Sequence, residues 1–171
     1  MSKHKIKVLI GSGIAAGAIS AAAAVSHGVT KKLASIAMDR PVPKVSEKAA
    51  SAVTGTDYQS EFSQHREEAA ERLRDKEHQT VEVEAIDGEK LVGHWFFREE
   101  AKRTIVAMHG WRSSWGDDFG MIADFWLNND CNVLFAEQRG QNNSGGDYMG
   151  FGLLERYDCV DWAFWVQQQC N

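Results

Sequence analysis

Two short loops that each follow an apolar run contain the residues best placed to do chemistry. The first is His109-Gly110-Trp111, directly after residues 105–108, and the second begins at Glu137, after residues 132–136. A backbone that turns at the carboxyl end of a buried strand directs its N–H groups into the crevice where open α/β sheets bind ligands. One such N–H can stabilise an oxyanion. The first loop therefore predicts a backbone donor for an oxyanion.

Serine residues near these loops could serve as nucleophiles, but their surroundings favour structural roles. Ser113 and Ser114 lie close to Asp117 and Asp118 on a loop before a helix, without a base at a plausible spacing. Such serines usually make turns and caps. Ser144 stands among Asn and Gly residues and is also interpreted as a turn residue. The sequence Gly-x-Ser-x-Gly does not occur in the 171 residues.

The elements that must position these loops alternate between strands and helices. Val81, Val83 and Ala85 have the period of a half-buried strand, and Asp87-Gly88 is a hairpin signal. The runs 105–108 and 132–136 are typical of strands covered on both faces. Helices are expected over residues 117–127 and from residue 153 onward. The last helix has Leu153, Tyr157, Val160 and Phe164 on one stripe and Trp162 and Val166 opposite, so we expect it to be covered twice.

Residues 104–166 resemble the first part of the catalytic domain of an α/β-hydrolase, in the esterase, lipase and acyl-transferase-like branch. His109-Gly110-Trp111 matches the family's His-Gly-X, and the family turn Asp-x-Arg-Gly-His-Gly-x-Ser is matched at Arg139, Gly140 and Ser144 but not at Glu137, Gln141 and Asn142. The resemblance implies that the N–H of Trp111 forms half of an oxyanion hole. It assigns loop-ordering roles to His109, Gly110, Arg139 and Gly140. The runs 144–148 and 151–152 also resemble the membrane-anchored Gram-positive subgroup.

The catalytic groups of that family are not found in this sequence. A triad hydrolase needs a nucleophile, a base and an orienting acid, and in this fold they follow in the order nucleophile, acid, histidine. We therefore expect residues 79–171 to be the N-terminal part of an α/β-hydrolase domain, an incomplete fold without its nucleophile, acid and base. The strand at 105–108 would then be an open edge, and residues 79–171 would be prone to aggregation. The alternative is a non-catalytic, membrane-anchored binding domain.

The first 32 residues predict a separate membrane anchor or signal segment. Lys3, Lys5 and Lys7 precede an apolar core of 18 residues, 8–25, which is rich in Ala and Gly. That length could just span a bilayer, and the basic start favours a cytoplasmic N-terminus with the domain outside. A cleaved signal at Ala22-Ala23-Ala24, giving a secreted protein, or a soluble cytoplasmic segment remain alternatives. Residues 7–17 also imitate a dinucleotide-binding fingerprint, but no acidic residue follows at the required position.

Residues 33–78 are expected to form a linker and a charged helix. Prolines at 41 and 43 disfavour helix, and from Asp57 to about His78 the pattern turns helical with a solvated, charged face. His65 and His78 are interpreted as surface residues. The net charge of −5 gives no reason to expect nucleic acid. Cys131, Cys159 and Cys170 have no metal-ligand spacing, so we expect no metal or cofactor. The resemblance to α/β-hydrolases implies a small-molecule acyl substrate for the complete enzyme.

Overall fold

The computed structural model describes residues 25–41 and 59–170. The chain divides into two compact units between Ala37 and Met38. The described residues of the first unit, 25–37, are helical and mostly exposed, and the second unit holds the sheet and the other helices. Except for Val25, the predicted anchor 8–25 lies outside the described residues, as do the fingerprint-like run and most of the linker. Within the described ranges, no helix is both long enough and apolar enough to cross a bilayer.

The second unit is built on a four-stranded sheet in the order β1-β2-β4-β3. β1 (Gln79–Glu84) and β2 (Lys90–Phe96) form the predicted antiparallel hairpin, and β2 also pairs antiparallel with β4 (Cys131–Ala136). β3 (Arg103–Met108) pairs in parallel with β4. All six residues of β4 are buried, as its continuous apolar run predicts for a strand covered on both faces.

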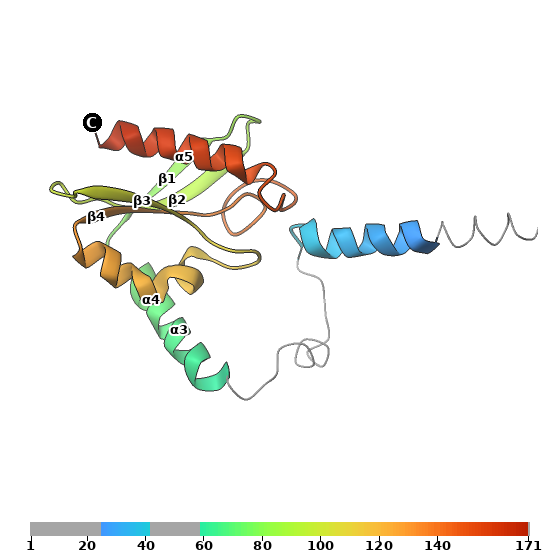
Figure 1. Cartoon of the computed structure of the whole chain (residues 1–171), viewed down its shortest axis with the longest axis horizontal. Helices are drawn as coiled ribbons and strands as arrows, with labels where there is room; N and C mark the ends of the chain where they lie inside the picture. Colours follow the sequence, from blue (N-terminus) through green and yellow to red (C-terminus); the bar gives the residue numbers. More distant parts are fainter. Residues whose placement is uncertain (1–24, 42–58, 171) are drawn as a thin grey trace, which may run out of the picture. The chain divides into compact units, whose positions relative to one another are not determined.

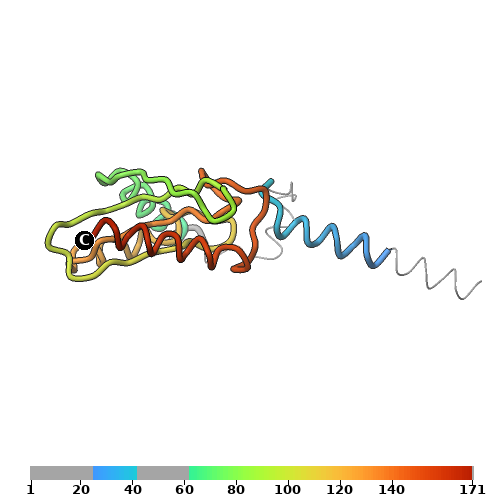
Figure 2. The backbone as a smooth tube through the Cα atoms, turned by 90° about the horizontal axis from the view of Figure 1, so that it is seen from above, coloured from blue at the N-terminus to red at the C-terminus, as the bar shows by residue number. Residues whose placement is uncertain are grey.

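Helices cover the two faces of this sheet. α5 (Glu155–Gln169) runs along one face, and α4 (Trp115–Asn128) lies on the other with α3 (Gln59–Arg74) beyond it (Figures 1 and 2). The first core, between the sheet and α4, contains Phe96, Trp115 and Phe135. The second, between the sheet and α5, contains Leu91, Leu134 and Trp162. The helix bounds differ from those expected by one to three residues at most ends, which is the usual uncertainty of capping and fraying.

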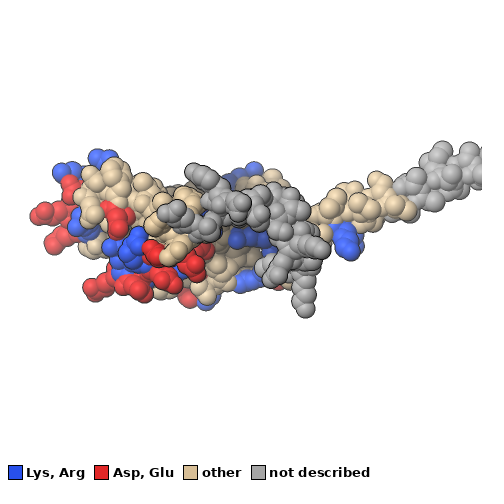
Figure 3. Space-filling view, turned by 90° about the horizontal axis from the view of Figure 1, so that it is seen from below, with Lys and Arg blue, Asp and Glu red and all other residues tan. Residues whose placement is uncertain are grey.

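α3 crosses α4 at very short range because small residues meet there. Ala69 and Ala70 are buried, and a Cβ added to Gly120 would lie 2.7 Å from the backbone of both. The two backbones therefore nearly touch. On the side of the molecule drawn in Figure 3, acidic and basic side chains are interspersed. The predicted solvated face of α3 is thus present, and its buried residues Ala69, Ala70 and Leu73 lie toward the rest of the second unit.

The outer side of α5 and the free edge of β3 are open. Among the strands that the structure describes, β3 pairs only with β4. On α5 and the turn before it, the stripe of Leu153, Tyr157, Val160 and Phe164 is 44–65% exposed, whereas Trp162 and Val166 face the sheet. The prediction of apolar groups on two faces of this helix is confirmed. So is the edge position of β3 within the described sheet.

Residues 38–41 form a short strap on the glycine-rich loop. Met149 N donates to Met38 O at 2.6 Å, Arg40 N donates to Asp147 O at 2.8 Å, and Asp39 bridges to Tyr148. The Arg40 guanidinium also donates to the carbonyl oxygens of residues 142, 144 and 146. We expected residues 33–78 to be a linker and a charged helix. Asp39 and Arg40 of the expected linker are instead bound to the domain.

Candidate functional site

Parallel pairing of β3 with β4 brings the two predicted loops to one edge of the sheet. Met108 and Ala136, the last residues of the two strands, are register partners. The chain therefore leaves both strands at the same level, and His109 and Glu137 start neighbouring loops. This is the crevice position in which open α/β sheets bind ligands. The two loops thus meet at the carboxyl ends of the strands, as the sequence predicted.

His109 is buried between the loops and joins them. Its Nδ1 lies 2.9 Å from Gly110 O, and its Nε2 lies 3.1 Å from both Gln138 N and the side-chain nitrogen of Asn142. A carbonyl only accepts and a backbone N–H only donates, so Nδ1 carries the proton and Nε2 accepts. Gln138 also donates its side-chain amide to His109 O. Because the Nε2 lone pair is already used, His109 orders the loops and is not placed to act as a base.

The amides on both sides of Trp111 are held by side chains. Gly110 N donates to an Asp118 carboxylate oxygen and Arg112 N to the Gln141 amide oxygen, each at 2.6 Å. Ser113 Oγ donates to the other Asp118 oxygen at 2.6 Å. The loop therefore has a defined shape around the Trp111 N–H. Ser114 caps α4 by accepting from Asp117 N, the role that the sequence indicated.

A cavity of about 250 Å³ opens beside this loop. Its lining includes Trp111, Phe151 and Met149, with Gln138, Gln141 and Glu155 as the polar groups. The rings of Trp111 and Phe151 lie 6.4 Å apart at 30°, and both side chains are more than half exposed. Both Glu155 oxygens accept backbone N–H groups, from Gly150 and Gly152. The cavity thus offers aromatic surface and has no basic residue in its lining.

The glycine-rich loop is held from inside by Glu137 and Ser144. Glu137 accepts from Asn143 N at 2.6 Å, and fully buried Ser144 donates to Glu137 O while accepting from Val92 N. Gly140 has φ +69°, and a Cβ there would meet Tyr148 O at 2.6 Å, so only glycine fits. The Ser144 hydroxyl is therefore committed to the turn, in line with its interpretation as a turn residue.

Arg139 joins three separate parts of the fold through its guanidinium. It donates to Asp158 on α5 at 2.7 and 2.5 Å and to Asp87 in the β1–β2 turn at 2.7 Å. The Asp158 hydrogen bonds raise the pKa of Arg139 above its ordinary value, against the effect of burial and with help from Asp87. The Arg139 hydrogen bond in turn lowers the pKa of Asp87. Arg139 is thus bound in a structural ion network and does not line the cavity.

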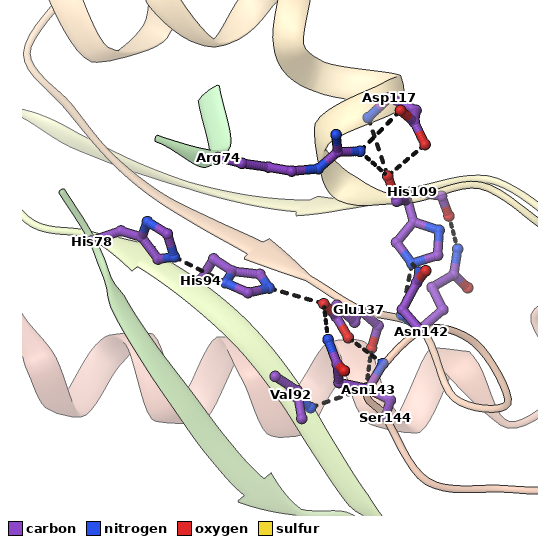
Figure 4. Close-up of polar contacts among 12 residues, drawn as sticks. Arg74, His78, Val92, His94, His109, Asp117, Glu137, Asn142, Asn143 and Ser144 are labelled. Atoms are coloured by element: carbon purple, nitrogen blue, oxygen red, sulfur yellow. Dashed lines mark hydrogen bonds and ion pairs between the residues drawn. The ribbon is translucent and has the colours of Figure 1, made fainter. Parts of the chain in front are cut away.

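Sequence reasoning missed two histidines beside this loop. His94, on β2, is buried and contacts Glu137 at 2.9 Å, and His78 contacts His94 at 3.2 Å (Figure 4). The interpretation of His78 as a surface residue is incomplete: the residue is half-buried, and its ring stacks on Phe96. No local pattern in the sequence marks this contact: it depends on the register of β2 with β4, which sets His94 opposite Phe135, two residues before Glu137.

The described residues show free thiols and no metal cluster. Cys131 is buried, and Cys159 and Cys170 are exposed. Over residues 25–41 and 59–170, no three His, Cys, Asp or Glu side chains are grouped so that they could hold a metal ion.

Comparison with known proteins supports the fold. No family model matches the sequence, and no curated protein matches it. Two solved structures of the Pyrococcus furiosus esterase Pf2001 match 54% of this chain at 30% and 29% identity, with TM-scores of 0.49 and 0.50. The DcsB complex with its substrate analogue matches 53% at 20% identity and a TM-score of 0.49. The match spans only 36–37% of the esterase chains. The described residues therefore have an α/β-hydrolase-like fold, similar over about half of this chain to an esterase.

Proposed function

We propose that this chain provides the oxyanion-binding part of a serine hydrolase that acts on ester or related acyl bonds. The observation that carries the proposal is the pair of loops at the ends of β3 and β4, with the amides on both sides of Trp111 held by Asp118 and Gln141. The likeness to an esterase supports the same reaction class. The nucleophile, acid and base would lie on polypeptide outside residues 1–171.

In the complete site, the Trp111 N–H would donate to the carbonyl oxygen of the substrate. A histidine takes the proton of the serine hydroxyl while the serine oxygen attacks the carbonyl carbon of the substrate. The attack leaves a negative charge on the carbonyl oxygen. A fixed N–H aimed at this oxygen stabilises the tetrahedral intermediate more than the substrate. His109 would hold the loop in shape throughout, because its Nε2 already accepts two hydrogen bonds.

The cavity beside Trp111 suits an uncharged acyl or alcohol group. Trp111, Phe151 and Met149 give it apolar walls, and the Glu155 carboxylate disfavours an anionic substituent. We therefore propose a neutral small-molecule ester as the substrate class. The open edge of β3 and the exposed stripe on α5 would be covered by the rest of the hydrolase domain, through a further strand and a further helix.

The chain by itself is expected to show no serine-hydrolase activity. Ser113 and Ser114 donate their hydroxyls to carboxylates of Asp118 and Asp117, and Ser144 donates to a carbonyl, so none is paired with a histidine base. We expect no turnover of short p-nitrophenyl esters and no labelling by a fluorophosphonate probe. An active esterase at the same concentration is the positive control. Covalent labelling of any of these three serines would contradict the proposal.

We propose that residues 8–25 anchor the chain in the cell membrane, with the domain outside the cytoplasm. The apolar run of 18 residues and the lysines before it support this placement. Expressed in a bacterium, the full chain is expected to stay with the membranes through a carbonate wash, whereas a variant lacking residues 1–32 should be released. Recovery of the full chain in the soluble fraction would rule the anchor out.

A further inference from the structure

Three hydrogen bonds form a continuous line from the end of α3 to the glycine-rich loop. His78 Nδ1 lies 2.7 Å from Lys76 O, and His78 Nε2 lies 3.2 Å from His94 Nδ1. His94 Nε2 lies 2.9 Å from Glu137 Oε1. Figure 4 shows the two rings in sequence, pointing at the Glu137 carboxylate. Both imidazoles therefore use both of their nitrogens.

The ends of this line determine how many protons it holds. Lys76 O is a carbonyl and only accepts, so His78 Nδ1 must donate. Glu137 already accepts the backbone N–H and the side-chain amide of Asn143, so it is a carboxylate and His94 Nε2 must donate to it. The central contact between the rings needs one further N–H. The two imidazoles then carry three ring protons, whereas two neutral imidazoles carry two.

We propose that His78 and His94 together form a proton-binding site, whose extra proton fastens the segment between α3 and β1 to the sheet. Loss of that proton would leave two lone pairs facing each other at 3.2 Å. One contact must then open. His78 is the half-buried member at the outer end, so it is the group that moves away. Residues 75–78 would be loosened with it.

The surroundings of the pair suit a shared positive charge. His94 stacks on Trp115 with ring centroids 4.2 Å apart, and His78 stacks on Phe96 at 5.1 Å. Aromatic faces attract cations. Burial pushes the pKa of Glu137 upward, but hydrogen bonds from His94 and Asn143 outweigh it and hold that pKa below its ordinary value. The negative charge that balances the pair is therefore present at neutral pH.

Other charged groups on the neighbouring elements already have partners or are exposed. Arg74 pairs with Asp117 at 3.0 Å, and Lys76 pairs with Asp124 at 3.1 Å. These charged groups, near the end of α3 and on α4, are therefore already paired with each other. Asp118 accepts from Gly110 N and Ser113. Asp75 and Glu77, in the connecting segment, are exposed, and on β1 and β2 Glu82 pairs with Lys90. Among the contacts that the structure describes, Glu137 is the charged group bonded to the pair.

The direction of the pH effect follows from the proton count. The folded arrangement binds one proton more than the two neutral imidazoles of the unfolded chain. The free energy of unfolding therefore increases as the pH falls, until the histidines of the unfolded chain are protonated as well. It decreases as the pH rises and the shared proton is released. Across that range the unfolding equilibrium constant is expected to rise by up to about tenfold per pH unit.

Histidine-selective ¹⁵N labelling of the full chain in detergent micelles tests the proposal directly. Imidazole ¹⁵N shifts report which nitrogens carry protons, between about pH 5 and 8, where histidine changes charge. We expect three protonated ring nitrogens in total for His78 and His94 near neutral pH. As the pH rises, one of these protons should be released, and the amide exchange of residues 75–78 should become faster at the same time. Two protonated nitrogens at the low end of this range would overturn the proposal.

Two variants separate the pair from the other histidines. His78→Phe keeps a ring against Phe96 but removes both nitrogens, and it should abolish the component of the pH dependence of unfolding that comes from the shared proton. His65→Phe removes an exposed histidine whose one recorded partner is Glu68 at 3.9 Å, and it should retain that component. Equal pH dependence in His78→Phe and the unmodified chain would also overturn the proposal. The spectra of the unmodified chain decide the matter even where a variant folds poorly.

Discussion

Replacing Asp158 by alanine is expected to lower the free energy of unfolding of the second unit by about 3 kcal/mol or more. Asp158 and the Arg139 side chain are both buried, and the substitution leaves a buried guanidinium without its main partner. Asp87 still pairs with Arg139, which places the expected loss at the lower end of the range for broken buried ion pairs. Urea denaturation followed by tryptophan fluorescence measures the effect.

Glu82→Ala is the matched control for this substitution. Glu82 pairs with Lys90 at 2.8 Å, but both side chains are 57% exposed, so the pair contributes little in water. We expect the denaturation midpoint of Glu82→Ala to stay close to that of the unmodified chain. Equal midpoints for the two variants would mean that the Arg139 network does not link α5 to the β1–β2 turn.

The Asp87 carboxylate contributes to the loss of stability in acid. Hydrogen bonding to Arg139 keeps the folded pKa of Asp87 below the ordinary value of 3.8. Its contribution is therefore complete above that value and is lost as the pH falls through the lower, folded pKa. The proposed proton on the histidine pair acts in the opposite direction, at higher pH. The second unit is accordingly expected to be most stable in mildly acidic solution.

The elements of the sheet could be predicted because their signals are local. The alternation in β1, the Asp87-Gly88 turn and the continuous apolar run of β4 each indicate a strand without knowledge of its partner. Two such runs about 30 residues apart and joined by a helix imply a parallel crossover. His109 and Glu137 could therefore be predicted to lie at the same end of the sheet. The stripe on α5 was also visible, because helical periodicity shows both apolar faces.

The missed features depend on partners far away in the sequence. The Arg40 strap is over 100 residues from the carbonyl groups it binds, and no local pattern marks it. The close approach of α3 to α4 depends on Gly120, which in the sequence lowers helix propensity and gives no hint of a neighbour. His94 is one histidine in a strand, and its bond to Glu137 becomes visible only once the strand register is known.

Loss of the Trp111 backbone N–H is expected to lower kcat by about 10² to 10³ in a complete enzyme that contains this loop. Trp111→Pro removes the donor, because proline has no backbone N–H, whereas Trp111→Phe keeps both the donor and an aromatic ring for the cavity. The amides on both sides of Trp111 are bonded to Asp118 and Gln141, so the effect should come from the missing donor rather than from a freed loop.

A chimera provides the complete enzyme for this comparison. Residues 79–169 of this chain, from β1 to α5, replace the corresponding strands and helices of the Pyrococcus furiosus esterase, which is 29% identical over 54% of this chain. The host supplies the remaining part of its own fold. Circular dichroism and thermal unfolding of the three chimeras confirm that they are folded to the same extent before rates are compared.

The kcat of the chimera and its two Trp111 variants on a p-nitrophenyl ester tests the central claim most directly. We predict an active parent chimera, a Trp111→Phe variant within a few-fold of it, and a Trp111→Pro variant that is about 10² to 10³ slower at a similar KM. A folded Trp111→Pro chimera that matches Trp111→Phe in kcat would contradict the assignment of this loop to an oxyanion hole.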